Sequence, residues 1–401
     1  MLGWELPPNN SGGLGVASYQ LCRALSKSGA AIEFILPYEP VPELSFMKVT
    51  AAYTDEIAKL FIPGLAYESG RYRFDKTTGA VNGFDLFTQE HLYSLAVERM
   101  VESREFDVIH AHDWLTFRAA LKAKHRTGWP LIVHVHSVEA DRSGQPGGGN
   151  PWVREIEALG LMMADQIVAV SERTKQSICD EYGMPADKVQ VIYNSVDREE
   201  LEPLDSDNAY AYLTDMRAKG YRVVGNIGRL TIQKNLPNLL RAAKAVIDRV
   251  PKTLFLIVGS GEQYEELIEL AAELGILKNV IFTGFQRGKN WRDAFASSDL
   301  FVMPSLSEPF GLTPLEALHY GTPSLISYQS GVSEVLKNCL KVDFWDIREM
   351  ANQIAGALQN DALRGTLLQN AQAELEHLTW DEPASRLLGL YEHHALAGAA
   401  Q

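Results

Sequence analysis

The stretch SLSEPFGLTPLEALHYGTP, residues 305–323, decides the predicted fold. It follows the apolar run Leu300–Met303, which is typical of a buried strand. Gly311 is unfavourable inside a helix, whereas TPLE at 313–316 has the pattern of an N-cap residue, a first-turn proline and a capping-box glutamate. The stretch therefore predicts a strand, a loop and a short helix that starts at Pro314.

The predicted start of this helix is a candidate anion site. A helix N-terminus after a buried strand offers unpaired amides and a partial positive charge, so the amides around Gly311, Leu312 and Thr313 can hold a diphosphate. The two glutamates of the stretch also have a plainer interpretation, in which Glu316 only caps the helix and Glu308 is a solvated loop acid. Taken alone, the capping pattern leaves both interpretations open.

Composition bounds the class of protein. With 401 residues, of which 46% are hydrophobic, the chain is long enough for two or more domains with apolar cores. A net charge of −14, without a block of basic residues, argues against nucleic acid and anionic membranes as main partners. Cys22, Cys179 and Cys339 are widely separated and odd in number, which fits a reducing compartment. Since neither a basic N-terminal region nor an apolar run long enough for a membrane span is present, we expect a cytoplasmic protein.

Strand-like apolar runs alternate with helical patterns in both halves of the chain. The predicted strands lie at 1–6, 32–36, 108–112, 131–136, 166–170, 189–193, 222–227, 254–258, 280–282, 300–303 and 324–327. This alternation predicts parallel sheets covered by helices on both faces, with ligands at the carboxyl ends of the strands. The acidic segment 198–212 separates the halves and is the predicted linker. Within it, Asp205-Ser206-Asp207 matches a D-x-D metal motif, and we interpret the match as coincidence because it does not follow a strand.

Four histidines lie on two of the predicted strands. His110 and His112 are two residues apart, as are His134 and His136, so each pair projects to one face of the sheet. Together with Asp113 they could hold a metal ion, and this gives an alternative function, a metal-dependent hydrolase. The plainer interpretation is that these imidazoles are buried and hydrogen-bonded.

Two loops at the carboxyl ends of predicted strands could approach phosphate. Gly12-Gly13-Leu14 precedes a helix but does not match the dinucleotide fingerprint, and loops of this composition are commonly structural turns. In the second half, Arg229 and Lys234 could grip a diphosphate, the arginine through its planar fork and the lysine as a point charge. The plainer interpretation makes them two surface cations.

Several motifs together resemble one family. Glu308 and Glu316, eight apart around Pro-Phe-Gly-Leu-Thr-Pro, resemble the E-x₇-E signature of retaining glycosyltransferases of family four, which include the bacterial glycogen and starch synthases. Gly12-Gly13-Leu14 is similar to the Gly-Gly-Leu loop of those enzymes, although Asn10 stands where they commonly have lysine. The stretch His110 to Trp114 resembles their His-x-His-Asp-Trp sequence.

The same resemblance extends to the second half of the chain. Gly228-Arg229-Leu230, followed by Lys234-Asn235, resembles the family's donor-phosphate loop, and Trp380-Asp381-Glu382 resembles the start of its closing helix. The resemblance implies an α/β protein with the GT-B fold, in which two doubly wound Rossmann-like domains face each other across a cleft. It implies an acceptor-side domain at 1–205, a nucleotide-sugar-binding domain at 206–378 and a helix at 379–401 that crosses back to the first domain.

The resemblance also implies a reaction and site residues. It implies that a hexosyl group, most simply glucosyl, is transferred with retention to a glucan or other saccharide acceptor. The donor substrate is expected to be a nucleotide-sugar, ADP- or UDP-glucose, and no cofactor or metal is expected. The family's site residues fall at Gly12, Gly13 and Leu14 in the Gly-Gly-Leu loop, Arg229 and Lys234 on the diphosphate, Gly311, Leu312 and Thr313 on phosphate, Glu316 on the ribose, and Glu308 and His136 beside the transferred sugar. A GT-B sugar-nucleotide epimerase is a further alternative.

Overall fold

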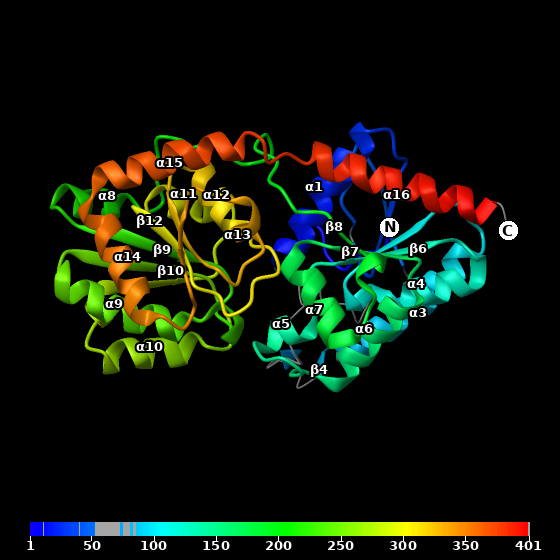
Figure 1. Ribbon diagram of the computed structural model, residues 1–401, viewed down its shortest axis with the longest axis horizontal. Helices are drawn as coiled ribbons and strands as arrows, with labels where there is room; N and C mark the ends of the chain where they lie inside the picture. Colours follow the sequence, from blue (N-terminus) through cyan, green and yellow to red (C-terminus); the bar gives the residue numbers. More distant parts are fainter. Residues whose placement is uncertain (11, 40, 53–72, 75–80, 83–85, 400–401) are drawn as a thin grey trace. The chain divides into compact units, whose positions relative to one another are not determined.

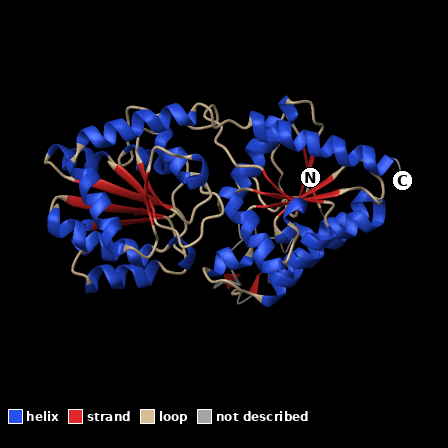
Figure 2. Cartoon of the chain, in the orientation of Figure 1, coloured by secondary structure: helices blue, strands red, loops and turns tan. Residues whose placement is uncertain are grey.

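The computed structural model describes residues 1–10, 12–39, 41–52, 73–74, 81–82 and 86–399 (Figure 1). The chain divides into two compact units. The first unit comprises Met1–Ala140, Gly147–Asn194 and Trp380–Gln401, and the second unit comprises Asp141–Pro146 and Ser195–Thr379. In each unit the strands lie between helices, as expected for an α/β protein (Figure 2). The domain boundaries predicted at residues 205 and 378 remain predictions.

The second unit is built on a parallel six-stranded sheet in the order β11-β10-β9-β12-β13-β14. Its four inner strands are almost wholly buried, as parallel strands covered on both faces require, whereas the edge strands β11 and β14 are mostly half-buried. Val224 of β9, for example, pairs with Phe255 of β10 on one side and with Leu300 of β12 on the other. The strands are β9 (Arg222–Ile227), β10 (Thr253–Val258), β11 (Val280–Gly284), β12 (Leu300–Met303), β13 (Ser324–Ser327) and β14 (Leu340–Val342).

Helices of the second unit pack on the sheet and on one another. α9 packs against α10 and α14, and α12 packs against α11 and α15. On α9 the buried Leu236, Leu239, Leu240 and Val246 recur at helical spacing and form the face that joins the apolar core. The helices are α8 (Ala211–Ala218), α9 (Leu236–Arg249), α10 (Tyr264–Glu273), α11 (Lys289–Ala296), α12 (Thr313–His319), α13 (Val332–Val335), α14 (Ile347–Gln359) and α15 (Asp361–Leu375).

The strand order of this sheet locates a ligand site. Numbered along the chain from β9 to β14, the order is 3-2-1-4-5-6, the doubly wound order in which the connection reverses direction between the first and fourth strands. Ligands of such sheets bind outside the carboxyl ends of those two strands. In the second unit these ends belong to β9 and β12, and the loops that leave them span residues 228–235 and 304–312.

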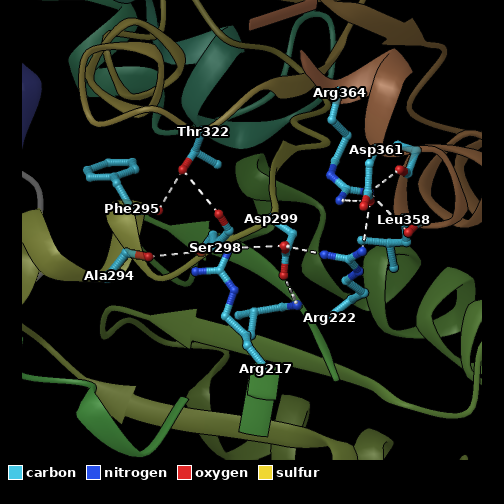
Figure 3. Close-up of polar contacts among 12 residues, drawn as sticks. Arg217, Arg222, Ala294, Phe295, Ser298, Asp299, Thr322, Leu358, Asp361 and Arg364 are labelled. Carbon is cyan, nitrogen blue, oxygen red and sulfur yellow. Dashed lines mark hydrogen bonds and ion pairs between the residues drawn. The ribbon is translucent and has the colours of Figure 1, made fainter. Parts of the chain in front are cut away.

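The amino ends of β9 and β12, opposite the ligand loops, carry an ion-pair network (Figure 3). Asp299 precedes β12, is buried, and accepts hydrogen bonds from the Val223 amide at 2.8 Å and from Arg217 at 3.0 Å. Arg222 contacts Asp299 at 3.3 Å and Asp361 of α15 at 2.7 Å. The network therefore ties α8, β9 and α15 to the start of β12.

The first unit contains a parallel sheet of similar design. β5 to β8 pair in sequence order, and Leu2 bridges Ile35 of β1 on one side and Ala111 of β5 on the other. The strands are β1 (Glu33–Leu36), β2 (Lys48–Ala51), β5 (Ile109–His112), β6 (Leu131–Val135), β7 (Gln166–Ala169) and β8 (Val189–Val191), with β3 (Arg73–Phe74) and β4 (Val81–Asn82) as a separate antiparallel pair.

Helices of the first unit include the last helix of the chain. α16 packs beside α1, where the Trp380 indole donates to the Gln20 side-chain oxygen at 2.8 Å (Figure 1). The helices are α1 (Gly13–Lys27), α3 (Leu86–Val101), α4 (Trp114–Thr127), α6 (Pro151–Met163), α7 (Glu172–Tyr182) and α16 (Asp381–Ala399), while α5 (Glu139–Ser143) crosses the boundary at Ala140. Among the residues described, none of the helices has both the length and the apolar character that a membrane crossing requires.

One predicted strand is shorter in the structure, and one long helix was not predicted. The predicted first strand at 1–6 is reduced to the bridge at Leu2, because the chain bends away toward the Pro7-Pro8 turn after this single pairing. Helix α3 was not predicted, since its apolar residues follow an irregular sequence and form only a weakly amphipathic pattern.

Candidate active site

The loops after β9 and β10 lie backbone against backbone. The Gly228 amide donates to the Val258 carbonyl at 2.9 Å, and the Leu230 amide donates to the Ser260 carbonyl at 2.9 Å. A Cβ atom on Gly259 would lie 1.8 Å from the Gly228 carbonyl oxygen, and one on Gly261 would lie 2.3 Å from that of Leu230. Only glycine fits these two positions, so the Gly-Ser-Gly sequence supports the loop that presents Arg229.

A single 3₁₀ turn, Ile232–Lys234, links the β9 loop to the loop after β12. The Gln233 side chain donates to the Ser307 carbonyl at 2.8 Å, and the Leu306 amide donates to the Gln233 carbonyl at 2.9 Å. Asn235 has a left-handed backbone, φ 57°, and donates to the Pro304 carbonyl at 3.0 Å. The two loops at the switch point are therefore cross-linked by buried hydrogen bonds.

This arrangement brings Lys234 and Glu308 into contact. The Lys234 ammonium forms an ion pair with Glu308 Oε2, and the Ser305 hydroxyl donates to the same oxygen at 3.1 Å. Glu308 is only 8% exposed, and its amide is held by the Gln329 carbonyl at 2.9 Å. Glu308 is therefore a buried, paired carboxylate and not the solvated loop acid of the plainer interpretation.

The start of α12 differs from its prediction. The helix begins at Thr313 and not at Pro314, because Leu312 already has a right-handed helical backbone and occupies the N-cap position. The Thr313 hydroxyl points to the Met303 sulfur, 3.7 Å away, so it does not accept from the helix amides. The capping box with Glu316 is therefore not formed. Gly311 precedes the helix with φ 97°, in the left-handed region that favours glycine.

The carboxyl group of Glu316 has a raised pKa. Burial raises its pKa from 4.5 to about 7, although a hydrogen bond from the Trp291 side chain acts in the opposite direction. Its Oε2 atom is buried and has no hydrogen-bond partner among the described residues. A buried acceptor without a donor is costly, so this oxygen is suited to a ligand hydroxyl.

The predicted Gly-Gly-Leu loop forms the start of α1. Gly12 is the N-cap residue with an extended backbone, Gly13 is exposed, and Leu14 is buried. The buried Glu5 carboxylate, which the sequence analysis did not identify, accepts from the Gly15 amide at 3.2 Å. It lends negative charge to the same helix end that was predicted to approach phosphate.

His136 lies at the carboxyl end of β6, next to His112 of β5 and to Asp113, which follows that strand. Its ring Nε2 lies 3.0 Å from the His112 Nδ1 atom, and its amide donates to the Asp113 carboxylate at 2.6 Å. Asp113 adopts φ 57°, which turns its carboxylate toward the end of β6. Burial lowers the pKa of His136, while the Asp113 charge raises it.

The predicted site residues are divided between the two units. Gly12, Gly13, Leu14 and His136 belong to the first unit, and Arg229, Lys234, Glu308, Gly311, Leu312, Thr313 and Glu316 belong to the second unit. Within the second unit, the cross-linked loops bring Lys234 and Glu308 together. The D-x-D match in the linker is already paired, because Asp205 and Asp207 both contact Lys289, at 3.2 and 2.9 Å.

Comparisons with known proteins identify the family. The family model for Glycosyltransferase Family 4 matches residues 11–200, and that for Glycosyl transferases group 1 matches residues 216–374. The D-inositol 3-phosphate glycosyltransferase of Nocardia farcinica is 31% identical over 339 residues, which cover 78% of this chain and 74% of that protein.

Solved structures show the same fold. Sucrose-phosphate synthase from Thermosynechococcus elongatus has a TM-score of 0.76 at 19% identity, over 96% of this chain and 94% of that one. Anabaena Alr3699/HepE, solved in complex with UDP-glucose, has a TM-score of 0.67 at 19% identity, over 97% and 98% of the two chains. The chain therefore belongs to the glycosyltransferases of the family 4 type, with the GT-B fold of two Rossmann-like domains.

Proposed function

We propose that the enzyme transfers a hexosyl group, most simply glucosyl, from a nucleoside-diphosphate sugar to a saccharide or glucoside acceptor, with retention at the anomeric carbon. The observation that carries the proposal is the pair of cross-linked loops at the carboxyl ends of β9 and β12. There Lys234 pairs with Glu308, and Glu316 follows with a buried oxygen that has no partner in the described part of the chain. The UDP-glucose complex of the HepE neighbour makes UDP-glucose the first donor to test, with ADP-glucose second.

The donor diphosphate would lie between positive groups of the second unit. Arg229 stands on the loop held by Gly259 and Gly261, and Lys234 on the turn that is tied to the β12 loop. Both side chains are partly exposed, so a ligand can reach them. We assign them to the diphosphate, where two cations neutralise the charge that develops as the sugar leaves. The Leu312 and Thr313 amides would complete this phosphate site.

The remaining residues of the second unit would hold the ribose and the sugar. Glu316 would accept hydrogen bonds from the ribose hydroxyls, which supplies the donor that its Oε2 atom lacks. Glu308 would lie beside the sugar and keep Lys234 oriented, because the ammonium that pairs with its carboxylate would also contact a phosphate oxygen. His136 would lie beside the transferred sugar from the first unit.

In the proposed reaction the departing diphosphate also guides the attack of the acceptor hydroxyl. The bond from the anomeric carbon to the diphosphate oxygen breaks, and the acceptor hydroxyl oxygen bonds to the same face of that carbon. The hydroxyl proton passes to the departing diphosphate, whose charge Arg229 and Lys234 stabilise. Since two cations perform the role that Mg²⁺ or Mn²⁺ performs in other sites, we propose that transfer requires neither ion.

A donor screen tests the proposal. Release of free nucleoside diphosphate is measured from UDP-, ADP- and GDP-sugars, with and without glucosides, glucan oligomers and D-inositol 3-phosphate, the compound in the name of the Nocardia relative. We expect one donor to be consumed faster when its acceptor is present. Acceptor-independent conversion of the sugar nucleotide to an epimer, without release of nucleoside diphosphate, would contradict the proposal.

A further inference from the structure

Three imidazoles are stacked inside the first unit. His110 and His112 lie on β5, and His134 pairs with His112 in the β5–β6 register. The three residues are 1%, 0% and 1% exposed. The His110 ring lies parallel to that of His134 with centroids 5.3 Å apart, and stacks on that of His112 at 4.5 Å. Nothing proposed above for glycosyl transfer uses this cluster.

The cluster has more polar atoms than partners. His110 Nε2, His112 Nε2 and both ring nitrogens of His134 are buried without a hydrogen-bond partner among the residues that the structure describes. A neutral imidazole has one N–H donor and one acceptor nitrogen, and leaving either unpaired in the interior is unfavourable.

The Nδ1 atoms of His110 and His112 have partners outside the three-histidine cluster. His110 Nδ1 lies 2.5 Å from the Tyr391 hydroxyl of α16, and His112 Nδ1 lies 3.0 Å from His136 Nε2. In both residues the partnered atom is Nδ1 and the unpartnered atom is Nε2. This division is typical of metal-ligating histidines, which bind the ion through one nitrogen and donate the other N–H to a partner that fixes the ring.

We propose that His110, His112 and His134 bind one divalent transition-metal ion. One nitrogen from each residue lies within 4.8 Å of the others. Bonds of about 2.0–2.1 Å to a tetrahedral ion place ligand nitrogens about 3.4 Å apart, so the rings would turn inward by about an ångström when the ion enters. Three neutral imidazoles without a carboxylate favour Zn²⁺, Co²⁺ or Ni²⁺ over Mg²⁺ and Mn²⁺.

The ion would act on the first unit and not on the donor diphosphate, whose proposed ligands belong to the second unit. It would join β5 to β6 and, through Tyr391, to α16. With Nε2 of His112 bound to the ion, the Nδ1–H of that ring must donate to His136 Nε2. His136 then carries its own proton on Nδ1, so the ion would also set the tautomer of this residue.

Metal content and thermal unfolding test the proposal. The protein is purified without a histidine tag or a metal column, treated with a chelator and dialysed, and titrated with Co²⁺ and with Zn²⁺. We expect one Co²⁺ per chain with a visible absorption spectrum of tetrahedral nitrogen coordination, and a rise in Tm of several degrees at saturating metal. Binding well below one ion per chain, with an unchanged Tm, would overturn the proposal whatever the variants show.

Variants locate the ion. His134→Gln and His110→Gln should each weaken Co²⁺ binding at least tenfold, whereas His125→Gln, which changes an exposed histidine at the end of α4, should not. Both cluster variants are compared with the wild type in the metal-free state, which separates lost binding from lost folding. Stoichiometric Co²⁺ binding that survives in folded His134→Gln and His110→Gln would place the metal elsewhere and refute this site.

Discussion

Replacing Glu316 by glutamine should make the enzyme more stable above neutral pH and weaken its binding of nucleoside diphosphate. The reason is the pKa of the buried carboxyl, which is raised from 4.5 to about 7. The folded protein therefore binds this proton more tightly than the unfolded chain does. The contribution of Glu316 to stability is greatest below pH 4.5 and falls as the pH rises from 4.5 toward 7. It stays lower at pH 8, where the carboxylate is charged in both states.

The size of the effect follows from the same two values. A difference of about 2.5 between the folded and unfolded pKa corresponds to about 3 kcal/mol at pH 8. Partial exposure of the side chain and the buried amide of glutamine reduce this to about 1–2 kcal/mol. Thermal unfolding at pH 8 should show a Tm about 2–6 °C higher in Glu316→Gln than in the wild type, with a smaller gain at pH 5.

Binding should change in the opposite direction. Loss of a charged acceptor for the ribose hydroxyls costs about 1.5–3 kcal/mol, so the Kd of the nucleoside diphosphate at pH 8 should rise roughly 10- to 100-fold. Calorimetric titration measures this, with Glu273→Gln on the exposed face of α10 as the control that changes neither quantity. A lower Tm at pH 8 together with an unchanged Kd would show that Glu316 is neither destabilising nor in contact with the ribose, and would refute the argument.

Three further predictions concern the second unit and its ligands. Arg229→Ala and Lys234→Ala should each lower kcat by about 10²- to 10³-fold with the fold intact. The control Lys244→Ala, which removes an exposed cation paired with Asp248, should not lower kcat. Near-normal turnover in both Arg229→Ala and Lys234→Ala would place the diphosphate elsewhere. Asp299→Asn should destabilise the protein by about 2–4 kcal/mol without changing KM, because Arg217 loses its carboxylate partner and Arg222 keeps only Asp361, both at the amino ends of the strands and away from the ligand loops (Figure 3). A changed KM at normal Tm would count against this. Brief exposure to excess EDTA should leave the initial rate unchanged, and added Mg²⁺ or Mn²⁺ should not stimulate it; a rate that depends on either ion would show that the two cations are insufficient.

The alternation of strands and helices was predictable because buried parallel strands leave continuous apolar runs. Runs such as Leu254–Val258 and Leu300–Met303 were located to within a residue, and the family resemblance supplied the GT-B fold that the comparisons confirm. The strand order was not predictable from spacing, since it depends on which runs pair. The order is what places the loops of β9 and β12 at one site.

Side-chain roles at the site were harder to predict because they depend on contacts between distant residues. The pattern Thr313 to Glu316 matches a capping box, yet the helix starts one residue early and the Thr313 hydroxyl faces Met303 instead. The ion pair of Lys234 and Glu308 joins residues 74 apart in the sequence. Gly259-Ser260-Gly261 did carry a local signal, two glycines directly after a predicted strand, that could have indicated the close approach to the β9 loop.

Proton NMR of the transfer reaction tests the central claim most directly. An α-linked sugar nucleotide, chosen by the donor screen, is incubated with its acceptor, and the anomeric signals are recorded from the first minutes onward. The account predicts loss of the donor signal, equal release of nucleoside diphosphate, and a new α-anomeric signal with a small H1–H2 coupling. A β-linked product at early times, or donor loss that yields free sugar at a rate independent of the acceptor, would contradict retaining glycosyl transfer.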